Sequence, residues 1–256
     1  MKRHLALIAL VCLSLSTVRA AEPGTLKVMT YNVAAGREAS LEELAGYIRS
    51  VQPDLVALRE VDRMTGRIGN EQKDFATTLG HLTGMFPLFG KTLDFMGGHY
   101  GIGMLSRFPY ANVTKTLLPK ASPDEETRAL LAAEIELSPG DTVLFVCTHI
   151  DYSTPETRML QLGAVTELLQ QNPHPVLLGG DFNSLPDSPE ILTRMAAWQP
   201  LSGPEYTHPS QGPETRVRID YLYGYPAARW KLVSSQVDDV QLSDHRPVVS
   251  TVELLR

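Results

Sequence analysis

The residues most suited to chemistry in this sequence are acids, amides and histidines that each follow a short apolar run. Asp181 and Asn183 come after the run 176–180, and His149 ends the run 143–148. Carboxylates are seldom buried without a partner or a metal, because burying an unpaired charge is costly. The full set that we single out is Asn32, Glu60, His149, Asp181, Asn183, Asp220, Asp244 and His245.

Oxygen ligands in this set favour a hard divalent cation. Glu60, a second carboxylate and the neutral oxygen of Asn32 suit Mg²⁺, with Mn²⁺ as a substitute. The sequence contains neither paired cysteines nor a His-x-x-x-His motif of the kind that binds zinc. We therefore predict a magnesium site that includes Asn32 and Glu60.

The other polar groups match the needs of phosphoester cleavage, which requires an activated water and neutralisation of charge on the phosphate. Asp181 could take a proton from water, and Asn183 could hold that water or donate to a phosphate oxygen. His245 could bind phosphate as a cation if a carboxylate keeps it protonated, and Asp220 is a plausible partner. His149 is a second donor.

Periodicity and turn signals predict the elements that must position these residues. A capping box at Ser40 and Glu43 starts a helix that Pro53 closes, and Thr154 with Pro155 starts another. A further helix is predicted over residues 70–82. The predicted strands are 26–33, 55–58, paired strands within 86–105, the hairpin 128–137 with 142–150, and 176–178, 219–223, 230–237 and 248–254.

Hairpins and crossover helices coexist in this order of elements. That combination favours a mixed α/β sandwich over a purely parallel, doubly wound sheet. The chemical residues extend from Asn32 to His245, so both ends of the chain must fold together. We therefore expect one catalytic domain over residues 21–256.

The first twenty residues have the pattern of a secretory signal peptide. A basic start at Lys2 and Arg3 precedes an apolar run, and small residues end at Ala20. We expect cleavage near Ala20 and an extracytoplasmic protein, either periplasmic or secreted. The remaining chain has 20 basic and 29 acidic residues, a formal charge of −9, which gives no global attraction for nucleic acid.

One cysteine, Cys147, remains after that cleavage, so no intramolecular disulfide is expected. Its apolar neighbours predict a buried thiol in a strand. Nothing in the sequence implies a stable protein partner, and we expect a monomer.

Ordered motifs along the chain resemble those of the endonuclease/exonuclease/phosphatase superfamily, which has the fold of pancreatic deoxyribonuclease. Each motif alone is a weak signal, but the ordered set is specific and covers nearly all of residues 21–256. The motifs are Thr30-Tyr31-Asn32-Val33, Leu58-Arg59-Glu60-Val61, the segment 100–107, Thr148-His149, Gly180-Asp181-Phe182-Asn183, Arg218-Ile219-Asp220-Tyr221 and Ser243-Asp244-His245-Arg246-Pro247-Val248.

The resemblance implies a four-layer α/β sandwich, in which two mixed β-sheets pack face to face with helices on the outer faces. It assigns Asn32 and Glu60 to the metal, and it implies that Asp244 binds the metal or a metal-bound water, as in some members. It implies that Asp181, helped by Asn183, orients or deprotonates the attacking water. It also implies that Asp220 pairs with His245, and that His149 and His245 contact the scissile phosphate.

Three residues near these motifs bear on the pocket. Arg59 stands where many relatives have Gln, and Ile102 where close relatives often have Asn, so both could reshape it. Arg128 lies in a segment that resembles an arginine-containing strand of several relatives, and we place it among the phosphate-contacting residues. A structural ion pair is an equal alternative for Arg128. His99 and His208 are predicted to be loop residues.

The sequence therefore predicts an exported, Mg²⁺-dependent phosphoester hydrolase. A phosphodiesterase acting on nucleic acid, a phospholipid headgroup or a soluble ester is favoured. The alternatives are a phosphomonoesterase of the same fold and a non-catalytic module that binds a phosphorylated ligand.

Overall fold

The computed structural model describes residues 24–67, 72–209 and 216–256. The predicted signal peptide over residues 1–20 lies outside these ranges. Within them, no helix is both long and apolar enough to cross a membrane.

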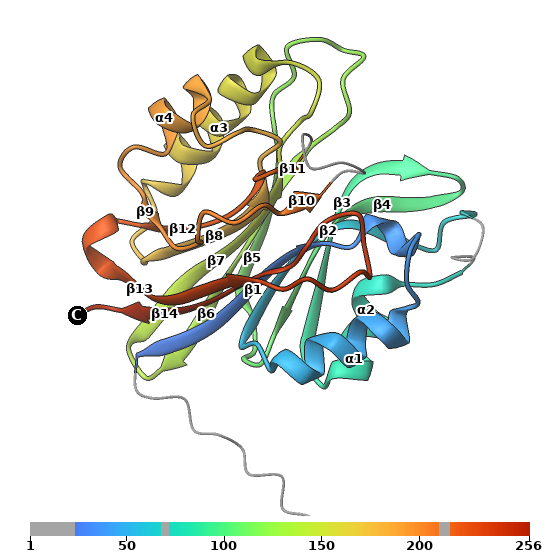
Figure 1. Ribbon diagram of the computed structural model, residues 1–256, viewed down its shortest axis with the longest axis horizontal. Helices are drawn as coiled ribbons and strands as arrows, with labels where there is room; N and C mark the ends of the chain where they lie inside the picture. Colours follow the sequence, from blue (N-terminus) through green and yellow to red (C-terminus); the bar gives the residue numbers. More distant parts are fainter. Residues whose placement is uncertain (1–23, 68–71, 210–215) are drawn as a thin grey trace, which may run out of the picture.

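The first sheet brings the two ends of the described chain together (Figure 1). Its last strand, β14, pairs antiparallel with its first, β1, and β1 pairs parallel with β2. In spatial order the strands are β13 (Trp230–Val237), β14 (Val248–Leu254), β1 (Thr25–Asn32), β2 (Leu55–Arg63), β4 (Gly98–Ser106) and β3 (Phe86–Phe95).

The second sheet also combines a parallel pair with hairpins. Strands β7 and β8 are parallel, while the neighbouring pairs are antiparallel. In spatial order the strands are β5 (Ala111–Leu117), β6 (Ala129–Ser138), β7 (Asp141–His149), β8 (Val176–Asp181), β12 (Asp220–Tyr225) and β9 (Gln199–Pro200). A separate small ribbon joins β10 (His208–Pro209) to β11 (Arg216–Val217).

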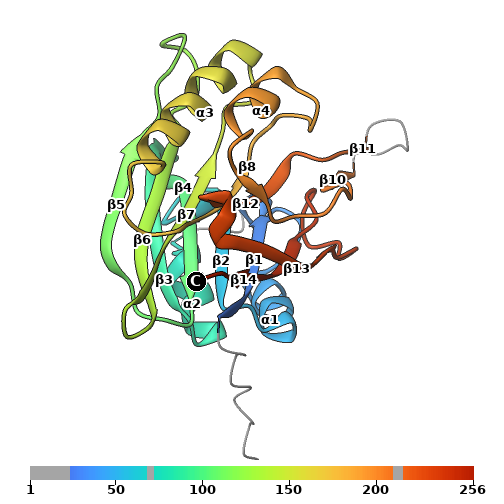
Figure 2. The same ribbon diagram turned by 90° about the vertical axis from the view of Figure 1, so that its left-hand side faces the viewer.

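Helices cover the outer faces of both sheets (Figures 1 and 2). On the first sheet these are α1 (Leu41–Val51) and α2 (Phe75–Thr83), and on the second they are α3 (Pro155–Leu169) and α4 (Pro189–Arg194). The capping box of α1 is present, since Ser40 Oγ accepts from the Glu43 amide and the Glu43 side chain accepts from the Ser40 amide.

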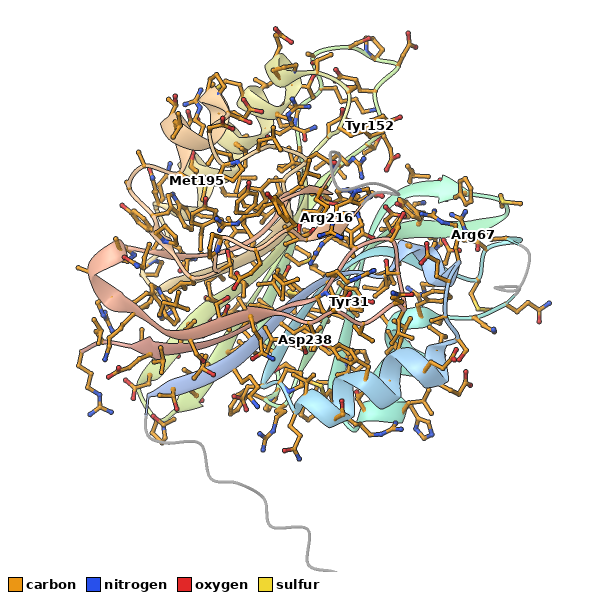
Figure 3. The ribbon with its side chains drawn as sticks, in the orientation of Figure 1. Tyr31, Arg67, Tyr152, Met195, Arg216 and Asp238 are labelled. Carbon is orange, nitrogen blue, oxygen red and sulfur yellow. The ribbon has the colours of Figure 1, made fainter. Side chains whose placement is uncertain are left out.

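Three apolar clusters fill the spaces between these four layers, and side chains occupy them densely (Figure 3). The cluster between the sheets includes Phe145 and Cys147. The cluster under α1 and α2 includes Tyr31, and the cluster under α3 and α4 includes Phe182. The predicted four-layer sandwich of two mixed sheets with outer helices is therefore confirmed.

Several element boundaries differ from the prediction for local reasons. The predicted strand 55–58 continues to Arg63, because a bulge at Glu60 lets pairing with β4 resume at Val61. Helix α2 begins at Phe75 rather than residue 70, since Asp74 caps it by accepting from the Thr77 amide; residues 70 and 71 lie outside the described ranges. Strand β5 was not predicted; all seven of its residues are exposed at the edge of the sheet, so the strand has no buried side.

Candidate active site

Strand register places three of the chosen residues side by side where neighbouring strands of the second sheet end or begin. In the parallel pair β7–β8, His149 lies opposite Asp181. In the antiparallel pair β8–β12, Asp220 lies opposite Asp181. All three are buried. Residues that are far apart in sequence thus converge because their strands end at the same level.

The first sheet supplies Asn32 from the end of β1 and Glu60 from the bulge within the neighbouring strand β2. Asn32 Nδ2 donates to Glu60 Oε1 at 3.1 Å and, across the gap between the sheets, to Asp181 Oδ2 at 3.1 Å. The amide of Asn32 therefore ties the site residues of one sheet to those of the other.

Two of the site residues have left-handed backbones. Glu60 has φ 53° at the β2 bulge, and Asn183 has φ 49° just after β8. Such a conformation is costly for a residue other than glycine and is retained mainly where the surroundings enforce it. A bulge redirects a side chain relative to its strand, and here it accompanies the placement of Glu60 beside Asn32.

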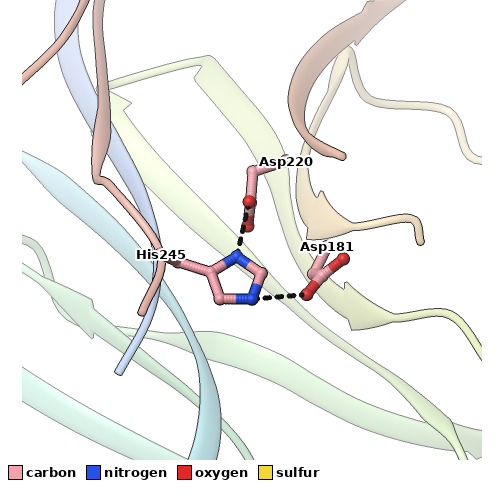
Figure 4. A group of neighbouring side chains, drawn as sticks. All are labelled: Asp181, Asp220 and His245. Carbon is pink, nitrogen blue, oxygen red and sulfur yellow. Dashed lines mark hydrogen bonds and ion pairs between the residues drawn. The ribbon is translucent and has the colours of Figure 1, made fainter. Parts of the chain in front are cut away.

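One carboxylate oxygen, Asp181 Oδ2, is the centre of the cluster, and Figure 4 shows the ring of His245 facing it. Besides the Asn32 amide, it has His149 Nε2 at 3.5 Å and His245 Nε2 at 3.7 Å. The other oxygen of Asp181 accepts from the Asn183 backbone amide at 3.0 Å. Asn183 in turn places Nδ2 at 2.9 Å from the Ile150 carbonyl and 3.3 Å from His149 Nε2.

Behind this centre, His245 and Asp220 form a buried pair. His245 Nδ1 lies 2.8 Å from Asp220 Oδ2. The second Asp220 oxygen accepts from Nη2 of Arg59, whose Nη1 donates to Thr30 Oγ1 and to the Ala57 carbonyl. Asp220 is thus held on one side by a guanidinium and on the other by an imidazole.

The surroundings set opposite protonation states for the two histidines. Burial opposes the charged form of His245, but Asp220 and Asp181 outweigh it and raise the pKa of His245 to about 9. Burial, reinforced by the positive charges of Arg128 and Arg59, holds the pKa of His149 well below its ordinary value. At neutral pH His245 is therefore a cation and His149 is neutral.

The two aspartates also differ. Burial, followed by repulsion from Asp220, raises the pKa of Asp181. Burial acts in the same direction on Asp220, but His245 and Arg59 hold the pKa of Asp220 below its usual value. The anionic form of Asp220 is thus favoured, while Asp181 has the raised proton affinity that a general base requires.

Glu60 and Asp244 lie on the solvent side of the site, and both form an ion pair with the same arginine, Arg37. The guanidinium of Arg37 lies 3.4 Å from Glu60 Oε2 and 3.4 Å from Asp244 Oδ2. Ser243 fixes this region by donating to the Asn32 carbonyl at 2.7 Å. Two carboxylates that face a common cation, next to the Asn32 amide, fit an oxygen-liganded divalent metal.

Asp181, Asp220 and His245 also lie close enough to hold a metal, with one ligand atom of each within 4.8 Å of the others. The ion pairs among these three residues argue against their binding a metal. A protonated His245 has no free lone pair, and Asp220 is already paired with both His245 and Arg59. The assignment of the metal to Asn32, Glu60 and Asp244 stays a prediction, since Asn32 directs Nδ2 to Glu60 and its Oδ1 accepts from the Ala34 amide.

Arg128 lies beside the cluster without a hydrogen bond to its members among the described residues. Its Nη1 lies 3.1 Å from Glu126 Oε1, and its Nε lies 3.8 Å from Asp151 Oδ2. The side chain is buried, and its charge reaches His149. The contacts of Arg128 are therefore those of a structural ion pair. Its charge still acts on His149, so the side chain lies close to the site.

Sequence reasoning missed three residues that contact the site. Arg59 was expected only to reshape the pocket, yet an arginine within an otherwise apolar strand signals a buried partner. Arg37 and His208 carried no signal, because their partners are distant in sequence. The prediction that His99 and His208 are loop residues is wrong: His99 lies in β4, and His208 lies in β10 with its ring 4.6 Å from that of His245.

Comparison with known proteins agrees with this arrangement. The sequence pattern of the Endonuclease/Exonuclease/phosphatase family matches residues 29–245. The protein cwh43 of Schizosaccharomyces pombe is 30% identical over 159 residues, which cover 61% of this chain and only 16% of cwh43. The YbhP protein of Escherichia coli K12 is 24% identical over 263 residues, covering 90% of this chain and 97% of YbhP.

Solved structures show the same fold at low sequence identity. An endonuclease/exonuclease/phosphatase from Beutenbergia cavernae superposes with a TM-score of 0.72 at 22% identity, covering 90% of this chain and 72% of that one. The human Nocturnin catalytic domain with a bound sulfate anion gives 0.68 at 19% identity, covering 90% and 95%. With the family pattern spanning the site from Asn32 to His245, the chain belongs to the endonuclease/exonuclease/phosphatase family, whose members hydrolyse phosphoesters.

Proposed function

We propose that this protein is an exported, divalent-metal-dependent phosphodiesterase. The observation that carries the proposal is the position of Asp181 Oδ2, which the amide of Asn32 and the imidazoles of His149 and His245 surround. A carboxylate with raised proton affinity, bordered by neutral and cationic donors, suits the activation of a water beside a phosphate.

In this proposal Asp181 accepts the proton of the attacking water. The Asn183 amide positions that water or a phosphate oxygen, since Asn183 is fixed to Asp181 through its own backbone amide. His245 stabilises negative charge on the phosphate as a cation, and Asp220 keeps its imidazole oriented. His149 donates to the phosphate as a neutral imidazole.

Asn32, Glu60 and Asp244 would hold the metal. A bound Mg²⁺ or Mn²⁺ would neutralise charge on the phosphate and the leaving group. Arg128 adds a positive charge next to His149 and lies 5.9 Å from the ring of Tyr152. Tyr152 is 67% exposed, at the upper side of the molecule in Figure 3, and is available to a substrate group beyond the phosphate.

The charge balance of the buried cluster favours a diester over a monoester. His245 and Arg59 are positive, and Asp220 and ionised Asp181 are negative, so the cluster carries no surplus positive charge. A diester brings one negative charge to the site, whereas a monoester brings about two at neutral pH. A monoester would therefore depend more strongly than a diester on the positive charges of the metal and of Arg128.

Export rests on the signal peptide pattern of residues 1–20. Without that segment the chain has a formal charge of −9, which gives no general attraction for nucleic acid. We therefore rank nucleic acid, lipid headgroup diesters and soluble diesters equally as candidate substrates. A substrate panel must therefore contain all three.

The test is hydrolysis of bis(p-nitrophenyl) phosphate and of p-nitrophenyl phosphate with Mg²⁺, with Mn²⁺ and with EDTA. We expect faster turnover of the diester and loss of activity in EDTA. Asp181→Asn should lower kcat by about 10²- to 10⁴-fold, because it removes a general base. Asp187→Asn is the matched control, since Asp187 is exposed in the loop after β8.

The outcomes separate the alternatives. A monoester preference would replace the diesterase assignment with a phosphatase. Equal rates for Asp181→Asn and Asp187→Asn would refute the role of Asp181. Inactivity on the whole panel, combined with binding of phosphate esters, would favour the non-catalytic module.

A further inference from the structure

Arg37 lies over the two outer carboxylates of the site. Its Nη1 lies 3.4 Å from Glu60 Oε2, and its Nη2 lies 3.4 Å from Asp244 Oδ2. A single guanidinium therefore pairs with both acids to which we assign the metal and compensates part of their charge.

The backbone places Arg37 there through a strained turn that begins at Asn32. Ala34 and Ala35 are both buried and left-handed, with φ 49° and 51°. The turn is closed by Asn32 Oδ1, which accepts from the Ala34 amide at 3.0 Å, and by the Arg37 amide, which donates to the Ala34 carbonyl at 3.1 Å. Strain of this kind persists where the surroundings enforce it.

The contacts of Arg37 are loose compared with those of the buried arginine. Charge-assisted hydrogen bonds are usually about 2.7–2.9 Å long, and both distances here are longer. The Arg37 side chain is 46% exposed and that of Asp244 is 40% exposed, whereas Arg59 and Asp220 are completely buried. Arg37 can leave its carboxylates without opening the core.

The surface also offers Arg37 another place to lie. A hollow of about 340 Å³ borders it on the side of α1. The hollow is lined by Glu38, by Glu43, whose carboxylate already accepts from the Ser40 amide, and by Lys73, so Glu38 is the acid that a displaced guanidinium would face.

We propose that Arg37 is an exchangeable counter-ion of the metal carboxylates. It neutralises Glu60 and Asp244 in the metal-free protein, and a divalent cation must displace it in order to bind them. Arg37 therefore lowers the metal affinity while it stabilises the metal-free site, as the linkage between two competing cations requires. The inference rests on the proposed function, because it takes Glu60 and Asp244 as metal ligands.

The test is calorimetric titration of the protein with Mn²⁺ and with Mg²⁺, comparing the wild type with Arg37→Met and Arg63→Met. Arg63 is the matched control: its side chain is 48% exposed and pairs with Asp74 at 3.0 Å, near the end of the strand that carries Glu60. We expect Arg37→Met to bind metal about three- to twentyfold more tightly, from the loss of two exposed ion pairs. The gain in Tm on adding metal should also be larger than in the wild type.

Each other result would overturn the inference in an identifiable way. An equal gain in affinity for both variants would mean that only the overall charge matters. Unchanged or weaker binding by Arg37→Met alone would mean that Arg37 does not compete with the metal. If no variant and no wild-type protein bound either cation, the metal dependence in the proposed function would fail as well.

Discussion

The guanidinium of Arg59 and the carboxylate of Asp220 form an ion pair in which both side chains are fully buried. The pair joins β2 of the first sheet to β12 of the second, across 161 positions of sequence. Because Asp220 also holds His245, the orientation of His245 depends on a residue of the opposite sheet.

Removing this arginine should destabilise the protein strongly. Arg59→Met leaves Asp220 buried with one cationic partner in place of two, and breaking a buried pair in this way costs about 3–5 kcal/mol. Urea unfolding followed by circular dichroism measures the change in the free energy of unfolding. Arg63→Met, which removes an exposed pair, should cost less than about 1 kcal/mol. Similar losses in the two variants would contradict the role given to Arg59.

Mutation should separate two contributions of Asn183: its left-handed backbone affects stability, and its side-chain amide affects activity. Asn183→Gly keeps the left-handed conformation at φ 49° but removes the amide that lies near His149. We expect the free energy of unfolding to stay within about 1 kcal/mol of the wild type, because glycine adopts this conformation without strain, while kcat falls by about 10²-fold or more. Asn183→Ala should lose both stability and activity. Full activity of Asn183→Gly would show that the side chain has no part in the reaction.

Cys147 should resist thiol reagents in the folded protein. Burial raises the pKa of Cys147 from the ordinary 9.0 to about 12, so the thiolate fraction at pH 8 is about a thousandfold lower than in the unfolded chain. Only the unfolded state ionises as the pH rises from about 9 toward 12, so the free energy of unfolding decreases over that range. Labelling with an aromatic disulfide reagent, in buffer and in denaturant, measures the difference. Rapid labelling of the folded protein would contradict the buried placement.

The capping box of α1 should contribute measurably to stability. Ser40→Ala removes the oxygen that accepts from the Glu43 amide at 3.2 Å, and the loss of such a cap costs about 1 kcal/mol. Ser50→Ala, in the last turn of the same helix, is the control and should change stability by less than about 0.5 kcal/mol. The difference in Tm between the two variants is the readout. A cost no larger than that of the control would mean that Glu43 alone caps the helix.

The sequence by itself determined the architecture and the residues at the strand ends. Alternating and continuous apolar runs are local signals, and they predicted strands such as β1 and β14 together with the capped helix α1. The signals failed where burial is absent or a local irregularity intervenes. All residues of edge strand β5 are exposed, and the bulge that carries Glu60 extends β2 beyond its apolar run.

The tertiary structure decided how the site residues are paired. The order of motifs indicated that Asp181, Asp220 and His245 act together, but it could not show that His245 lies between the two aspartates, with Nε2 facing Asp181 Oδ2 and Nδ1 facing Asp220. The cations Arg59 and Arg37 find their carboxylates only when distant strands and loops come together. Which charges pair with one another depends on contacts shorter than 4 Å between chain segments, and strand register and packing, rather than sequence spacing, set these contacts.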